Sequence, residues 1–249
     1  MRKMDKAIIL VAGKGTRLKP LTDTTHKCLT KVNGIPILIN TLNALDKIGI
    51  REVVLVVGYL GEEIHLIVGE QFGNIKIRYA WNMQYAETNT SASLQIGLED
   101  VFDFHRLFLL EGDVFFEEEI LKTLAEESCE NATVIEKYRE GLDGTFVELN
   151  SLGYVKDWRH KSTQDRTFDY KSKYKTVNIH RFGKEFVNDI LMPITNEVVQ
   201  EYNGKEPLES IMRRIVLRDE HILYGVETHG KKWVEIDNQK DLAIAERVF

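Results

Sequence analysis

The feature that most constrains this chain is an unbroken apolar run, Ala7–Ala12, which leads directly into Gly13 and Gly15. A strand that is buried on both faces of a parallel sheet has this continuous apolar character, whereas a strand with one wet face alternates polar and apolar residues. Glycines directly after such a strand let the backbone approach a ligand and aim N–H groups at phosphate oxygens. The chain therefore begins with a buried strand and a candidate phosphate-binding loop.

Apolar runs then alternate with segments of helical periodicity through the first half of the chain. Val53–Val57 and Leu107–Leu110 predict buried strands, and Ile37–Ile48 and Ser91–Val101 predict helices. This alternation predicts an α/β fold with a doubly wound, mostly parallel sheet and helices on both faces. Other predicted strands are 75–80, 133–138, 144–149, 154–158, 175–182, 222–226 and 232–236, and other predicted helices are 61–68, 117–127, 185–191, 207–216 and 241–248.

Composition and charge narrow the class of protein. The 249 residues include 43% hydrophobic and 29% charged residues, which is ordinary for a globular protein, and the net charge of −6 lacks the basic footprint of a nucleic-acid binder. No segment approaches the roughly 18 apolar residues that cross a bilayer, and Cys28 and Cys129 form no disulfide framework. We therefore expect one cytoplasmic domain over residues 1–249, with no nucleic-acid partner and no membrane span.

The glycine loop differs from two common phosphate-binding patterns. The P-loop pattern G-x-x-x-x-G-K-[ST] is absent, and a Rossmann G-x-G-x-x-G fingerprint would need a glycine at Leu18. The loop instead continues as a longer string, which is Ala12-Gly13-x-Gly15-Thr16-Arg17-Leu18-x-Pro20-Leu21-Thr22, followed by Lys27.

That string resembles the signature loop of the nucleotidyltransferases that join an NTP to a phosphorylated acceptor. The resemblance implies a Rossmann-like nucleotidyltransferase fold, with residues 1–130 mainly binding the nucleotide and a smaller acceptor-side region within 131–249. It also implies two catalytic residues: Arg17 would hold the β- and γ-phosphates, and Lys27 would neutralise the α-phosphate. The loop residues that the resemblance places against the nucleotide are Ala12, Gly13, Gly15 and Thr16.

Other segments are similar to the cytidylyltransferase branch of this family, which activates phosphocholine or small phosphonates such as 2-aminoethylphosphonate. Thr25-His26-Lys27 lacks the proline that the sugar-phosphate branch places before the lysine, and no Glu-Lys-Pro follows Gly153. The resemblance also covers Leu110–Asp113, Tyr174–Ile179 and Trp233–Asp237. It implies an enzyme that uses CTP and releases pyrophosphate. The alternatives are a sugar-1-phosphate nucleotidyltransferase and a non-catalytic, nucleotide-binding regulatory domain.

Acidic residues at two strand ends are candidates for a Mg²⁺ site. Asp113 lies shortly after the predicted strand 107–110, and Asp237 comes directly after the predicted strand 232–236. Carboxylates together with phosphate oxygens are typical Mg²⁺ ligands, and the resemblance implies that this pair holds the ion. Glu111 and Glu235 rank lower as metal ligands, because strand alternation is expected to turn them away from the ligand edge.

The base and the acceptor have less specific candidates. The resemblance places base and ribose contacts in the polar loop before 91–101 and acceptor contacts around 174–179. A quaternary ammonium on the acceptor would favour an aromatic cage, and a primary ammonium would favour carboxylates. The candidates for contacts to the nucleotide are Asn82, Asn89, Thr90 and Ser93, and those for contacts to the acceptor are Lys175, Asn178 and Glu111. The candidates for an aromatic cage are Trp81, Tyr85, Tyr138, Trp158 and Tyr174. Besides Glu111, the carboxylates that could bind a primary ammonium are Glu87, Glu136 and Asp143.

Overall fold

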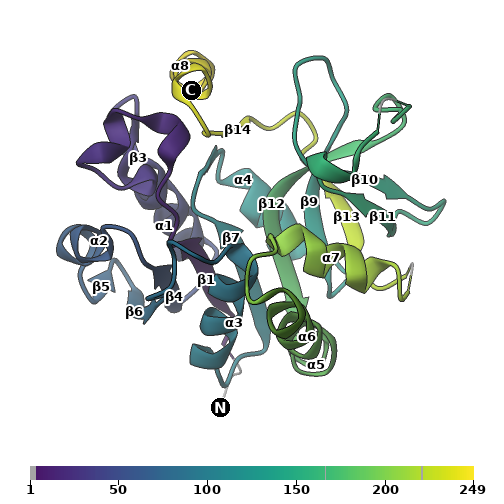
Figure 1. Ribbon diagram of the computed structural model, residues 1–249, viewed down its shortest axis with the longest axis horizontal. Helices are drawn as coiled ribbons and strands as arrows, with labels where there is room; N and C mark the ends of the chain where they lie inside the picture. The colour runs from purple at the N-terminus through teal and green to yellow at the C-terminus, as the bar shows by residue number, and fades with distance from the viewer. Residues whose placement is uncertain (1–3, 166, 220) are drawn as a thin grey trace.

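One large mixed sheet runs through both halves of the chain and carries helices on its two faces (Figure 1). The computed structural model describes residues 4–165, 167–219 and 221–249. The strands are β1 (Lys6–Val11), β2 (Lys31–Val32), β3 (Ile35–Pro36), β4 (Glu52–Val57), β5 (Gln71–Phe72), β6 (Ile75–Trp81), β7 (Arg106–Glu111), β8 (Val114–Phe116), β9 (Ala132–Lys137), β10 (Phe146–Leu149), β11 (Val155–Arg159), β12 (Tyr174–Gly183), β13 (Tyr224–Glu227) and β14 (Trp233–Glu235). The helices are α1 (Ile37–Lys47), α2 (Gly61–Val68), α3 (Thr90–Asp100), α4 (Glu119–Glu126), α5 (Lys184–Phe186), α6 (Met192–Tyr202), α7 (Leu208–Val216) and α8 (Gln239–Val248).

The sheet changes from parallel to antiparallel between the two halves of the chain. Its main path is β11-β10-β12-β7-β1-β4-β6-β5, and β9 and β13 extend it beside β12. β7, β1, β4 and β6 are parallel neighbours, whereas β12 runs antiparallel to β7, to β9 and to β10. The predicted α/β class with a largely parallel central sheet is confirmed. The second half adds antiparallel strands, because its short strands are joined mostly by turns instead of helices.

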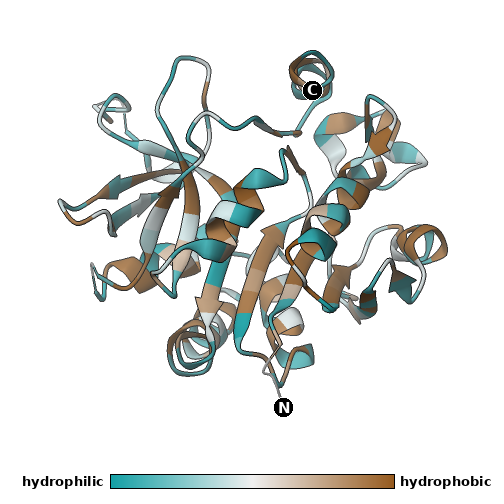
Figure 2. Ribbon diagram, turned by 180° about the vertical axis from the view of Figure 1, so that it is seen from behind, coloured by the Kyte–Doolittle hydropathy of each residue, from teal (hydrophilic) through white to brown (hydrophobic). Residues whose placement is uncertain are grey.

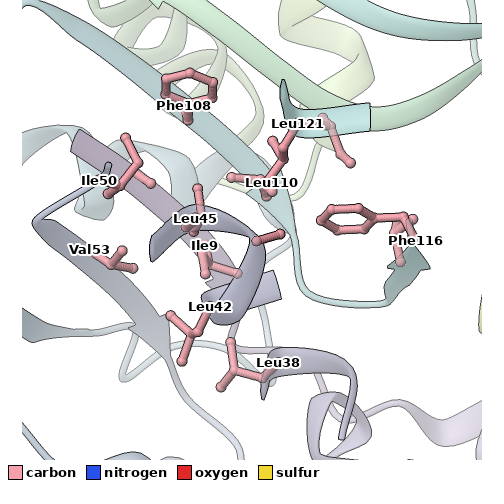
Figure 3. Packing of buried hydrophobic residues seen from close by; sticks show 14 of the residues in the cluster. Ile9, Leu38, Leu42, Leu45, Ile50, Val53, Phe108, Leu110, Phe116 and Leu121 are labelled. Carbon is pink, nitrogen blue, oxygen red and sulfur yellow. The ribbon is translucent and has the colours of Figure 1, made fainter. Parts of the chain in front are cut away.

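The core consists of two apolar layers, one on each face of the central strands. Every residue of β1 is buried, as its continuous apolar run predicts. Ile9 packs with α1 and α4 on one face, as Figure 3 shows around Leu42 and Leu121, while Ile8 packs with α3 on the other. In Figure 2 the central strands are largely hydrophobic along their length. The buried strands therefore hold the loops at their carboxyl ends on a rigid base.

One helix is absent from the sequence-based prediction. α6 begins at Met192 with Pro193 in its first turn, and it packs against α3 and α7. The helical conformation runs without a break from α5 through a π-helical turn, Val187–Leu191, into α6, and Pro193 comes directly after this turn. A proline inside a helix removes a backbone hydrogen bond, and a π-helical turn is a place where the regular hydrogen-bond pattern is already interrupted. α3, α6 and α7 together cover the sheet face opposite α1.

Two segments far apart in sequence form a small ribbon beside the carboxyl ends of β1 and β7. β8 pairs antiparallel with β14, and the C-terminal helix α8 follows directly, at the top of Figure 1. This pairing carries the end of the chain back over the glycine loop. Among the described residues, no helix combines the length and the apolar character that a membrane crossing requires.

Candidate active site

The glycine loop packs closely against the stem of Lys27. Gly15 has a positive φ of 58°, and a Cβ added to it would lie 2.8 Å from the Cβ of Lys27. The hydroxyl of Thr22 donates to the carbonyl of Gly15 at 2.9 Å and holds the turn in place. Glycine is required here by both the left-handed backbone and the close approach, so loop and lysine form one packed unit.

His26 shapes the turn that presents Lys27. Its Nδ1 accepts the backbone N–H of Cys28 at 3.1 Å, and its own backbone N–H donates to Glu63 at 2.8 Å. Burial lowers the pKa of His26 to about 4, so the ring is neutral and Nδ1 stays an acceptor at neutral pH. His26 thus forms the cap of the short helical turn Lys27–Leu29.

Lys27 lies between the two acidic residues that the sequence singles out. Its Nζ donates to Oδ2 of Asp113 at 2.7 Å and to Oδ1 of Asp237 at 2.8 Å. Arg17, whose side chain is 70% exposed, donates to the same Oδ1 of Asp237 at 2.7 Å. The structure therefore brings together the two residues expected to act in catalysis and the two expected to bind metal.

The β8–β14 ribbon is what places Asp113 next to Asp237. Val114 pairs with Glu235 across the ribbon, and the backbone N–H of Ile236 donates to the carbonyl of Asp113 at 2.8 Å. This register lines up the residue before β8 with the residues after β14. The two carboxylates meet because of strand pairing between distant segments.

The charges in this cluster stabilise one another. Burial alone would lower the pKa of the Lys27 ammonium, but the negative charges of Asp113 and Asp237 outweigh it and raise that pKa. Burial alone would raise the pKa of Asp237, but Lys27 and Arg17 outweigh it and lower that pKa. Lys27 is therefore a cation and Asp237 an anion at neutral pH.

A third carboxylate joins Asp113 and Asp237. One oxygen from each of these two residues and one from Glu235 all lie within 4.8 Å of one another. Oδ1 of Asp113 is buried and has no hydrogen-bond partner among the described residues. The sequence analysis ranks Glu235 below this pair as a ligand, but the structure places Glu235 beside them, because alternation with period two puts residues 235 and 237 on the same side of the chain. Three converging carboxylates with an unpaired oxygen suit a hard divalent cation.

Lys175 and Asn178 extend the charged cluster along β12. Nζ of Lys175 is buried and donates to Glu235 at 2.9 Å, and it lies 5.7 Å from the ring centroid of Trp233. The amide of Asn178 reaches Glu111 at 3.4 Å and Glu235 at 3.5 Å. Asn178 has a φ of 61°, where the register of β12 against β9 shifts. This irregularity turns its side chain toward Glu111 and Glu235.

Glu209 is a neighbour of Glu111 that the sequence analysis misses. It lies in the first turn of α7, where Thr145 donates to its Oε1 at 3.1 Å. Burial raises the pKa of Glu111 well above its usual value, and the nearby negative charge of Glu209 raises it further. No ion pair joins either carboxylate to a cation among the described residues. No local sequence pattern marks Glu209, because only the packing of α7 brings it to this site.

The charged cluster separates two cavities. A cavity of about 250 Å³ is lined by the glycine loop and the start of α3, and a larger one of about 930 Å³ is lined by β12, α7 and the loops after β9 and β11. Arg17, Lys27, Glu111, Asp113 and Asp237 line both. All the expected nucleotide contacts line the smaller cavity, and they are Ala12, Gly13, Gly15, Thr16, Asn82, Asn89, Thr90 and Ser93.

Several of those polar side chains already hydrogen-bond within the chain. The amide of Asn82 donates to Thr88 and to Ser93, each at 3.1 Å. The side chain of Asn89 accepts the N–H of Thr90 at 2.8 Å and caps α3. These bonds organise the wall of the smaller cavity, and base reading by these residues stays a prediction.

A comparison with protein families places this fold. Residues 7–219 match the model of the MobA-like NTP transferase domain. The chain belongs to this family. The named relatives include proteins that act on phosphonates, on phosphocholine and on sugar phosphates.

Three of the similar proteins are named for phosphonates or for phosphocholine. The chain is 30% identical over 236 residues to the CMP-5'-(3-aminopropyl)phosphonate synthase of Streptomyces rubellomurinus, a match that covers 95% of this chain and 37% of that protein. It is 37% identical over 185 residues to the 2-aminoethylphosphonate cytidylyltransferase of Lancefieldella rimae, with 72% and 62% covered. The chain thus spans less than two thirds of the length of either curated relative. The structure of the CTP:phosphocholine cytidylyltransferase of Streptococcus pneumoniae superposes with a TM-score of 0.80 at 22% identity, covering 98% of this chain and 99% of that one, which establishes the shared fold.

Proposed function

We propose that this chain is a cytidylyltransferase that transfers CMP from CTP to a small phosphonate ending in a primary ammonium, such as 2-aminoethylphosphonate, and releases pyrophosphate. The observation that carries the proposal is the position of Lys27 and Arg17 between the two cavities. A nucleotide in the smaller cavity and an acceptor in the larger one would approach the same cluster from different sides. Group transfer requires such an arrangement of two substrates around one charged centre.

The proposed chemistry is one in-line displacement. An oxygen of the acceptor phosphonate attacks the α-phosphorus of CTP and forms a new P–O bond. The bond between that phosphorus and the bridging oxygen breaks, and pyrophosphate leaves with the electron pair. The attacking oxygen is already anionic at neutral pH, so no side chain has to remove a proton from it. Catalysis then depends on positioning and on neutralisation of phosphate charge by Lys27 and Arg17.

The residues that would hold Mg²⁺ are Asp113, Glu235 and Asp237. Their carboxylates converge, and the unpaired, buried Oδ1 of Asp113 is left free for a ligand. When bound, the ion would supply further neutralisation of the phosphate charge.

The larger cavity has suitable charges for both ends of an aminoalkylphosphonate. Lys175, a buried cation on its wall, would bind the phosphonate oxygens. Glu111 and Glu209 would bind the ammonium, because the negative charge of Glu209 disfavours ionisation of the buried Glu111 carboxyl until a cation comes between them. The bound ammonium would lower the raised pKa of the buried Glu111 carboxyl, so that Glu111 would be an anion in that complex.

An aromatic cage for a quaternary ammonium finds little support in this cavity. Among the described residues that line it, Trp233 is the one Trp, Tyr or Phe, and Lys175 already faces its ring. Tyr138 packs on Phe146 and Tyr170, and Trp158 is buried in the core. Carboxylates, unlike aromatic rings, are abundant there. This favours a primary ammonium over choline.

An acceptor panel tests the proposal. Pyrophosphate release is measured with Mg²⁺ and CTP, ATP, GTP or UTP against 2-aminoethylphosphonate, 2-hydroxyethylphosphonate, phosphocholine and glucose-1-phosphate. We expect the highest kcat/KM for CTP with 2-aminoethylphosphonate. Turnover with glucose-1-phosphate alone would contradict the acceptor and retain nucleotidyl transfer, and no turnover with any pair would contradict the catalytic assignment.

Glu209→Gln is expected to raise the KM for 2-aminoethylphosphonate about 10- to 100-fold, because a charge-assisted hydrogen bond to the ammonium contributes roughly 1.5–3 kcal/mol. The KM for 2-hydroxyethylphosphonate, which has no ammonium, serves as the control and should change little. The substitution keeps the shape of the side chain and an oxygen for the Thr145 hydroxyl. Equal losses with both acceptors would show that Glu209 does not read the ammonium.

A further inference from the structure

We propose that Lys27 occupies the place of the divalent cation until a nucleotide arrives, so that metal and nucleotide bind together. The inference rests on the proposed function in one respect, namely that Asp113, Glu235 and Asp237 hold a divalent ion. It concerns a second role for Lys27, in addition to the neutralisation of a phosphate.

The ammonium of Lys27 uses oxygens that a metal ion needs. Its Nζ lies 2.7 Å from Asp113 and 2.8 Å from Asp237, which are two of the three converging carboxylates. These side chains are only 14%, 19% and 21% exposed, so water screens the contacts weakly. A cation placed among the three carboxylates would have to displace Lys27 or tolerate its charge at close range, and either requirement weakens binding.

Lys27 has a second place to go when phosphates are present. Its side chain lines both cavities, including the smaller one beside the glycine loop. The stem is held against Gly15, so only the tip of the side chain has to move. Phosphate oxygens would accept the ammonium in place of the carboxylates, and the carboxylates would then be free for the metal. In the free protein the carboxylates pair with Lys27. With metal and nucleotide bound, the carboxylates pair with the metal and Lys27 pairs with the phosphates. The move of Lys27 is therefore favourable only when the nucleotide is bound.

Arg17 does not hold the same position. Among the described residues Arg17 pairs with Asp237 alone, and its side chain is 70% exposed to water. Lys175 contacts only Glu235 among the three carboxylates, whereas Lys27 contacts both Asp113 and Asp237, so we assign to Lys27 the larger part of the block on metal binding.

The test is a titration of the full chain with Mn²⁺ alone, followed by electron paramagnetic resonance without nucleotide or acceptor. We expect Lys27→Met to bind Mn²⁺ at least tenfold more tightly than the unchanged protein, which corresponds to about 1.4 kcal/mol. Lys27→Arg keeps the charge and should bind as weakly as the unchanged protein. Lys47→Met is the control. Lys47 is an exposed lysine that pairs with Glu118, which is not one of the three carboxylates, so this variant should leave the Mn²⁺ affinity unchanged. Adding Asp113→Asn to Lys27→Met should abolish the gain and so locate it at this site.

Unchanged or weaker Mn²⁺ binding in Lys27→Met would overturn the inference, as would an equal gain in Lys47→Met. Lys27→Gln, which retains a polar tip between the carboxylates, replaces Lys27→Met if thermal unfolding shows that the latter is not folded. Because the readout needs no substrate, it separates the two proposals. A gain in Mn²⁺ affinity without turnover on the acceptor panel would contradict the proposed function alone.

Discussion

Lys27→Ala is expected to lower kcat/KM for pyrophosphate release by about a thousandfold, which is roughly 4 kcal/mol of lost transition-state stabilisation. The reason is that charge builds up on the phosphate oxygens during transfer, and Lys27 is a buried cation beside the glycine loop with a raised pKa. Its side chain is 14% exposed, so water cannot replace the lost charge well. Steady-state kinetics of pyrophosphate release measure the effect.

The matched control is Lys19→Ala. Lys19 lies in the same loop region, but its side chain is 58% exposed and pairs with Asp23 at the surface. We expect this variant to keep kcat/KM within about threefold, since exposed ion pairs contribute little. A loss below tenfold in Lys27→Ala would contradict a catalytic role for that residue.

Arg181→Ala is expected to lower the free energy of unfolding by about 3–5 kcal/mol, the cost of disrupting a buried charged network. Arg181 is 1% exposed, and its guanidinium donates to backbone carbonyls of the last turn of α4 and of the segment between α4 and β9. The carbonyls belong to Leu124, Ala125, Glu127, Cys129 and Glu130. Truncation removes the Arg181 donor from each of these carbonyls, of which Ala125 keeps a second donor in Arg106, and it opens a cavity beneath them; each effect destabilises the folded chain.

Urea unfolding of both proteins measures this difference, and the midpoint of thermal unfolding should fall by roughly 10 °C for a chain of this size. Arg218→Ala is the control, because its side chain is 53% exposed and pairs with Glu197 on the surface. That variant should change stability by less than about 1 kcal/mol. A similar small change in Arg181→Ala would mean that water satisfies the carbonyls.

Local patterns were sufficient to predict the parallel strands in the first half of the chain. The apolar run of β1 is continuous because both of its faces are covered, and Gly15 follows because the loop turns tightly against Lys27. The apolar run and the glycine loop each depend on residues that are neighbours along the chain, so a single stretch of sequence is enough to predict them. The same holds for the helices α1 and α3, whose apolar spacing reflects the face that they bury.

The candidate site was predictable only in part. Arg17 and Lys27 stand in a recognisable string, and the ends of two strands pointed to Asp113 and Asp237. The position of Glu235 beside these two residues was not predicted, and Glu209 was absent from the prediction. The charge of Glu209 on α7 acts on Glu111 at the end of β7, and neither segment carries a sequence pattern that predicts this proximity.

The sequence by itself therefore determined the buried parallel strands, the glycine loop and the resemblance to nucleotidyltransferases, because each depends on residues that are close together along the chain. Only the tertiary structure decided which charges meet. The β8–β14 pairing brings Asp237 and Glu235 to Asp113, and the packing of α7 brings Glu209 to Glu111. Electrostatic interactions depend on distance in space and on burial, and neither quantity is encoded in the spacing of residues along a single chain.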